Sequence, residues 1–130
     1  MNRKLIAAGL IGLALGTAAC RSPNLVMDIQ DAPIRPARAT EASVYKAIAD
    51  AGASLGWIIR KKGPGLAEGT LNLRRHKATV DISYSATSYS IRYKDSENLG
   101  YDADKRTIHP NYNGWIDNLN NAIGVRLAEQ

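Results

Sequence analysis

The chain of 130 residues has a single cysteine, Cys20, and no long run of apolar residues. One cysteine permits no internal disulfide, so no bridge can support a small hydrophobic core. The apolar stretch at residues 5–16 is shorter than the roughly 20 residues that a membrane-spanning helix needs. The 111 residues after position 19 are enough for one small domain and no more.

The usual motifs of catalytic and ion-binding loops are also absent. No Gly-x-Ser-x-Gly elbow is present to raise a serine into an oxyanion site. The glycines at 63–65 enclose a proline, which removes an N–H group that a phosphate loop needs. A calcium loop beginning at Asp95 fails because Leu99 stands at its fifth position and Arg106 at its twelfth, where oxygen ligands belong.

Histidine is scarce, with two residues and no His-x-x-x-His spacing. His76 is flanked by arginines and a lysine, which repel a metal cation, so we expect a solvated turn residue there. His109 precedes a proline and suits the capping of a helix. We therefore expect no enzymatic activity and no metal or other cofactor. The alternative is a small periplasmic hydrolase or metal-dependent site near His109, Asp102 and Tyr112.

The first 20 residues have the layout of an export signal. A positive segment at 2–4 precedes the apolar stretch, and small residues at 17–19 precede Cys20. This arrangement resembles the bacterial lipoprotein signal, in which the cysteine thiol is acylated and the cysteine becomes the new N-terminus. Thr17 departs from that pattern, which usually has leucine there. The alternative for Cys20 is a free or buried thiol, which is a liability in an oxidising compartment.

Location follows from the same resemblance. Arg21 follows the cysteine where aspartate often signals retention in the inner membrane, so the resemblance implies a lipid anchor, with palmitate or related chains, in the outer membrane facing the periplasm. Removal of residues 1–19 takes away Arg3 and Lys4 and leaves 15 cations, 12 acids and a net charge of +3. That mild charge suits anionic lipid or cell-wall polymer. We expect no nucleic-acid partner for an exported chain.

Three regions follow from composition: the signal peptide at 1–19, an extended tether at 20–39 and a single α+β domain at 40–130. The tether has three of the five prolines and no helical period. Residues 25–27 and Ile29 are a candidate edge strand within it. Thr40 is a good N-cap, and apolar residues then recur at helical spacing up to Gly56, a favourable residue to end a helix.

Period-2 alternation follows in the next part of the chain. It predicts strands from Trp57 to about residue 62, then at 67–74, 77–84 and 89–94. Residues 95–109 lack a period and predict a loop, and Pro110 suits the first turn of a closing helix. We expect a two-layer α-β-β-β-β-α fold in which a four-stranded antiparallel meander carries both helices on one face. The predicted buried side of the last helix comprises Tyr112, Trp115, Ile116, Leu119, Ile123 and Leu127.

Two regions are candidates for a binding surface. Arg92 and Lys94 share the predicted polar sheet face with Asp81, and such a face is either simply hydrated or a docking surface. The stretch from residue 98 to 119 is rich in aromatic and amide side chains. We predict Tyr112 and Trp115 as core anchors; the alternative is an aromatic ledge for a glycan or peptide. The candidate residues are Arg92, Lys94, Asn98, Tyr101, His109, Tyr112 and Trp115.

Three motifs carry a further resemblance: Gly56-Trp57 after the first helix, Ser-x-Asn-Leu-x-Tyr at 96–101, and Ile-His-x-Asn-Tyr-x-x-Trp-Ile at 108–116. Together they resemble a family of small uncharacterised proteobacterial lipoproteins, over residues 40–127. The resemblance implies the location and a compact α+β domain. We therefore expect a non-enzymatic binding or scaffolding lipoprotein, whose partner is an envelope protein or a cell-wall glycan.

Overall fold

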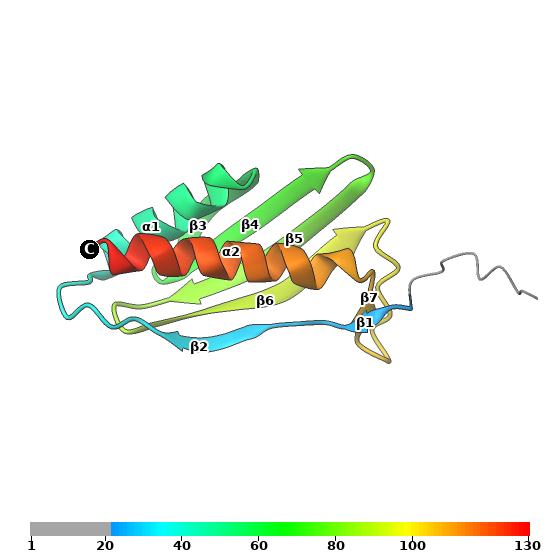
Figure 1. The fold of residues 1–130 in the computed structure, drawn as a ribbon, viewed down its shortest axis with the longest axis horizontal. Coiled ribbons are helices and arrows are strands. Elements are labelled where there is room, and N and C mark those ends of the chain that lie inside the picture. Colours follow the sequence, from blue (N-terminus) through cyan, green and yellow to red (C-terminus); the bar gives the residue numbers. More distant parts are fainter. Residues whose placement is uncertain (1–21) are drawn as a thin grey trace, which may run out of the picture.

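The computed structural model describes residues 22–130, so the predicted signal peptide and the lipidation of Cys20 lie outside the described residues. The described chain forms two helices and seven strands (Figure 1). The helices are α1 (Glu41–Ser54) and α2 (Asn111–Ala128), and the strands are β1 (Asn24–Leu25), β2 (Ile29–Pro33), β3 (Trp57–Gly63), β4 (Leu66–Leu73), β5 (His76–Tyr84), β6 (Ser88–Glu97) and β7 (Thr107–Ile108). Neither helix in this part of the chain has the length and apolar character needed to cross a membrane.

The main sheet has five strands in the order β2-β6-β5-β4-β3, all antiparallel, so the α+β class is confirmed and the predicted four strands are corrected. The additional strand is β2, which pairs with β6 at the edge of the sheet. It comes from the segment predicted as tether, where Pro33 ends the strand at an edge that tolerates a missing N–H. A separate two-stranded ribbon joins β1 to β7.

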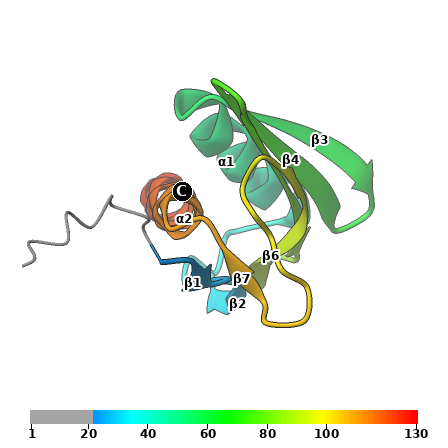
Figure 2. The same cartoon turned by 90° about the vertical axis from the view of Figure 1, so that its right-hand side faces the viewer.

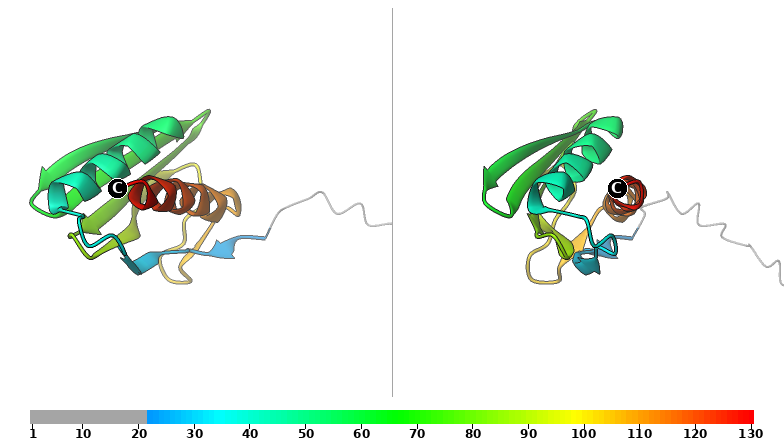
Figure 3. Two further views of the ribbon diagram at one scale, coloured as in Figure 1. Left: turned by 60° about the vertical axis from the view of Figure 1, so that its left-hand side comes forward. Right: turned by 90° about the vertical axis from the view of Figure 1, so that its left-hand side faces the viewer.

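The first helix begins and ends where its sequence predicts. The Thr40 hydroxyl accepts a hydrogen bond from the backbone N–H of Ser43, and the Ser43 hydroxyl accepts one from the N–H of Thr40, which forms a reciprocal cap. After the helix, Gly56 takes a φ of +86°, a conformation that side chains disfavour. Both helices lie on the same side of the curved sheet (Figures 2 and 3).

The core lies between that side of the sheet and the two helices. Alternate strand residues such as Val80 and Ile82 are fully buried against it, and so is Tyr112 at the start of α2. Helix α1 approaches β3 closely at Gly52, where an added Cβ would lie 2.5 Å from Cγ1 of Ile59. Trp115, predicted on the buried side of α2, is only partly buried.

Strand β6 is longer than predicted. It continues through Glu97, so the loop predicted from residue 95 begins at about residue 98. The register between β5 and β6 shifts between Thr79 and Val80: Val80 faces Tyr93, but Thr79 faces Asp95. Lys94 is therefore the additional residue of a β-bulge. The bulge interrupts the alternation of apolar and polar residues, so a period-2 pattern does not detect the strand beyond it.

Candidate binding surfaces

The sheet side turned away from both helices carries a row of charges across four strands. We call this side the outer face; it comprises Arg60, Glu68, Thr70, Asn72, Lys77, Thr79, Asp81, Ser83, Arg92 and Lys94. Arg60 faces Glu68, Glu68 faces Asp81, and Asp81 faces Arg92 in the strand register. Two acids directly opposite each other on β4 and β5 would repel.

Lys94 relieves this repulsion. Its Nζ lies 2.7 Å from Oε2 of Glu68 and 3.5 Å from Oδ1 of Asp81. The hydrogen bond from Lys94 lowers the pKa of the Glu68 carboxyl, and the same bond raises the pKa of Lys94. Because the Lys94 side chain is 44% exposed, water screens the pair and its contribution to stability is small. Arg92 donates a hydrogen bond to the Ser83 hydroxyl at 3.3 Å.

A shallow hollow of about 300 Å³ lies beside this row. Its lining residues are Ile58, Arg60, Glu68, Thr70, Asn72 and Lys77. Ile58 is half exposed there, and Asn72 lies directly opposite Lys77 in the register. The hollow therefore offers hydrogen-bond donors, hydrogen-bond acceptors and one apolar side chain.

Asn98 and His76 attach the loop after β6 to the turn between β4 and β5. The Asn98 side chain donates to the carbonyl oxygen of Arg75 at 2.7 Å, and His76 Nδ1 lies 2.8 Å from the carbonyl oxygen of Asn98. The His76 ring also lies close to two others, with centroids 5.4 Å from His109 and 6.1 Å from Trp115. His76 therefore lies beside the predicted turn and also helps to hold the loop after β6, a role that the sequence did not predict.

The residues of the alternative enzyme site have local structural roles. Nδ1 of His109 accepts a hydrogen bond from the backbone N–H of Asn111 at 3.1 Å, near the start of α2. Oδ1 of Asp102 accepts from the N–H groups of Asp104 and Lys105, at 3.0 Å each, and so closes a turn. Residues 22–130 contain no group of three or more metal-ligating side chains that could hold a metal ion.

Tyr112 is fully buried, and its hydroxyl has no hydrogen-bond partner among the described residues. Tyr93 lies between it and Tyr101: its ring stacks on Tyr101 with centroids 4.0 Å apart and meets Tyr112 edge-on at 5.9 Å. Burial raises the pKa of Tyr112 well above its usual range. The structure therefore places Tyr112 in the core, where no surface partner reaches it.

The seven candidate residues consequently fall into two groups. Arg92 and Lys94 lie on the outer face. Asn98 and Tyr101 lie in the loop after β6, and His109, Trp115 and the buried Tyr112 lie at the start of α2. The two groups do not form one surface. The outer face, which carries Arg92 and Lys94, combines exposed charges with the hollow beside them.

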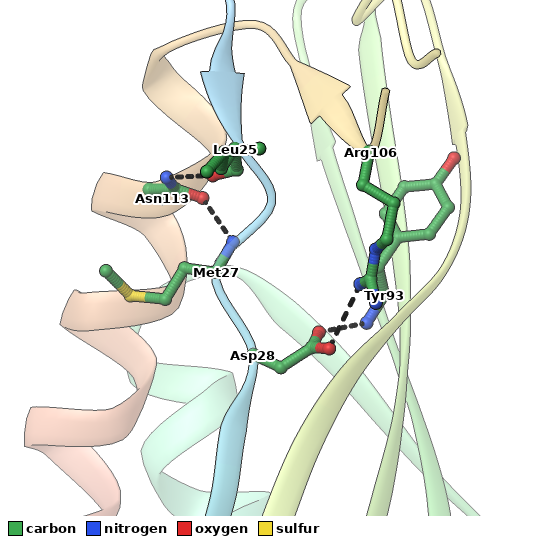
Figure 4. Close-up of polar contacts among 6 residues, drawn as sticks. All are labelled: Leu25, Met27, Asp28, Tyr93, Arg106 and Asn113. Atoms are coloured by element: carbon green, nitrogen blue, oxygen red, sulfur yellow. Dashed lines mark hydrogen bonds and ion pairs between the residues drawn. The ribbon is translucent and has the colours of Figure 1, made fainter. Parts of the chain in front are cut away.

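Sequence reasoning missed a set of polar residues that hold the N-terminal segment (Figure 4). Asn113 accepts a hydrogen bond from the N–H of Met27 at 2.9 Å and donates one to the carbonyl oxygen of Leu25 at 2.8 Å. Asp28 accepts from the N–H of Tyr93 at 3.1 Å and pairs with Arg106 at 3.1 Å. These partners are at least 65 residues apart in the chain, so no local pattern identifies them.

A further hollow of about 520 Å³ lies between residues 33–36 and the end of α2. Its lining is mainly apolar and includes Tyr89, Gly124 and Leu127. None of the seven candidate residues lines it.

Comparison of the chain with models of protein families, with curated proteins and with solved structures finds no match. The resemblance to small proteobacterial lipoproteins therefore rests on the sequence motifs alone.

Proposed function

We propose that this chain is a lipoprotein of the cell envelope, anchored through Cys20 in the outer membrane and facing the periplasm, whose domain is a non-enzymatic binding or scaffolding module. We also propose membership of the family of small proteobacterial lipoproteins. The layout of residues 1–20 supports the anchor. The outer face of the sheet supports the binding role.

The binding role rests on the observation that neither helix covers the outer face (Figures 2 and 3). An antiparallel sheet folds stably with one face in water, so this exposure alone requires no partner. The arrangement of charges on the outer face is what favours a binding role. Cations at both ends of the row flank two acids, and the adjacent hollow offers amide, hydroxyl and ammonium groups. Such a surface fits a polar partner with both donors and acceptors, either an envelope protein or a cell-wall glycan.

The alternative of a hydrolase or metal-dependent site near His109, Asp102 and Tyr112 gains no support from these contacts. His109 and Asp102 accept hydrogen bonds from neighbouring backbone N–H groups, and Tyr112 is sealed in the core. His109 bonds to the start of α2, Asp102 bonds within a turn, and Tyr112 packs in the core.

Metabolic labelling tests the anchor. Cells that express the full chain and receive a palmitate analogue should incorporate it, and Cys20→Ala should abolish the incorporation. Arg38→Glu, a change in the connector before α1, should incorporate the analogue like the wild type. Label that persists in Cys20→Ala would contradict the anchor.

Photocrosslinking in intact cells tests the binding role. A photoreactive residue in place of Arg92, on the outer face, should give one reproducible adduct with an envelope protein or with glycan. The same residue in place of Ala42, exposed on α1, should not. Lys94→Glu should reduce the adduct, whereas Arg38→Glu should leave it intact. Equal adducts from positions 92 and 42 would contradict a partner on the outer face.

A further inference from the structure

Residues 24–33, which we call the strap, form part of the folded domain. The strap is paired at both ends, because β1 pairs with β7 and β2 pairs with β6. Between the strands, the N–H of Val26 donates to the carbonyl oxygen of Arg106 at 2.9 Å. The Asn113 amide bonds to the backbone on both sides of Val26, as a neighbouring strand would (Figure 4).

Side chains hold the second half of the strap. The Asp28 carboxylate accepts a hydrogen bond from the N–H of Tyr93 on β6, and only 14% of its side chain is exposed. The N–H of Asp31 donates to the Ser90 hydroxyl at 2.9 Å. Apolar strap residues pack against the core, and these are Val26, Met27, Ile29 and Ala32. Hydrogen bonds and apolar packing therefore hold the strap at several independent points.

The position of the strap shortens the connection to Cys20. A free segment from Cys20 to Thr40 would span up to about 70 Å when extended, at about 3.5 Å per residue. With the strap fixed from Asn24, the span from Cys20 to the domain is at most about 14 Å. A bilayer with its headgroups is about 40 Å thick, so this distance is smaller than half of that thickness.

The surface at the strap's beginning is suited to a phospholipid interface. Leu25 is 71% exposed, and the neighbouring turn carries the exposed Lys105 beside the exposed Asp104. The turn between β4 and β5, which Asn98 ties to the same end, adds Arg74 and Arg75. An exposed leucine enters the interface between headgroups and acyl chains, while arginine and lysine bind lipid phosphates.

We propose that this end of the domain, formed by β1, β7 and the turns at 73–76 and 102–106, rests on the phospholipid bilayer. The inference depends on the proposed acylation of Cys20. Because β1 and the C-terminus lie at opposite ends of the long axis (Figure 1), the domain stands end-on, with the outer face accessible from the side. The short covalent connection determines this orientation, and the exposed leucine and cations complete the contact.

Site-specific fluorescence quenching tests the orientation. Acylation occupies Cys20, so a second cysteine introduced in the full chain provides a unique thiol. Lys105→Cys reports on the proposed contact, and Arg38→Cys, in the connector before α1, reports on the opposite end. Each acylated protein carries a polarity-sensitive dye and is reconstituted in phosphatidylethanolamine–phosphatidylglycerol vesicles that contain a headgroup nitroxide quencher.

We expect several-fold stronger quenching of the dye at position 105 than at position 38. Equal quenching in a protein shown to be acylated would overturn the orientation and leave the anchor intact. Failure of the chain to incorporate palmitate analogue would overturn both. The two results are therefore distinguishable.

A matched pair of variants tests the strap itself. Asn113→Ala removes both amide bonds to the strap, whereas Asn118→Ala changes an exposed asparagine of the same helix. Hydrogen exchange at Val26 and Met27 should accelerate in the first variant alone, and the quenching difference between positions 105 and 38 should shrink. Circular dichroism establishes that both variants remain folded. A quenching difference that persists after the strap exchanges freely would overturn its role in orientation.

Discussion

The two faces of the sheet are built from alternate residues of the same strands, yet they differ in almost every physical respect. On β5, Val80 and Ile82 are fully buried, while Asp81 between them is partly exposed and lies 3.5 Å from Lys94. The inner face is stabilised by removal of apolar surface from water, and the outer face by screened charge pairs. Stability and surface chemistry are therefore encoded at different positions and can be changed separately.

The largest expected contrast comes from two neighbours on β5. Ile82→Ala should lower the free energy of unfolding by about 2–5 kcal/mol, because a fully buried side chain leaves a cavity. Asp81→Ala should change it by less than about 1 kcal/mol, since it removes a screened pair and also the repulsion from Glu68. Urea denaturation of residues 20–130 measures both. Similar losses in the two variants would contradict the separation of the faces.

Two helical glycines test how tightly the inner layer is packed. Gly52→Ala should gain about 1 kcal/mol from helix propensity but lose about 1–3 kcal/mol from overpacking against Ile59, so a net loss is expected. At Gly124 an added Cβ meets open space, so Gly124→Ala should raise the free energy of unfolding by about 0.5–1 kcal/mol. The difference in Tm between the variants gives the comparison. A stabilised Gly52→Ala would show that Ile59 adjusts freely.

Buried tyrosines give the next effect in size. Tyr112→Phe removes a buried hydroxyl that has no hydrogen-bond partner within residues 22–130, so we expect unchanged or higher stability at neutral pH, by up to about 1 kcal/mol. Tyr89→Phe removes a hydroxyl that donates to Asn120, so it should cost about 1 kcal/mol. A large loss in Tyr112→Phe would indicate that the hydroxyl has a partner.

Alkaline titration sharpens this prediction. The pKa of Tyr112 is raised in the folded protein, so below about pH 10 the residue is neutral in both the folded and unfolded states. Above that pH the unfolded chain ionises first, and the free energy of unfolding falls. Tyr112→Phe should reduce this fall, and its advantage over the wild type should increase with pH. The other buried tyrosines with raised pKa, Tyr84 and Tyr89, should preserve part of the fall.

Local signals predicted the helices and the meander because their causes are local. The Thr40 cap, Gly56 and the alternation on β5 each lie within a few residues of the structure they determine. The bulge at Lys94 depends on its pairing with β5, and β2 depends on contacts with β6. Likewise, the role of Asn113 becomes visible only when residues 86–88 positions away come together. The candidate site divided because its residues are near in sequence but lie on different sides of the sheet.

The smallest expected effect concerns Lys94, the residue that links the charge row. Lys94→Met removes the cation that contacts both Glu68 and Asp81, so the two acids repel more strongly, with only the flanking Arg60 and Arg92 to offset the repulsion. The side chains are open to water, so we expect a loss of no more than about 1 kcal/mol, and added salt should diminish it. Lys46→Met, which removes the pair with Asp50 on α1, is the matched control on a helix. The separation of the two faces would be contradicted if Lys94→Met lowered the free energy of unfolding more than Lys46→Met does and the loss persisted in high salt. In that case a weaker crosslink in Lys94→Glu could reflect lost stability as well as lost binding.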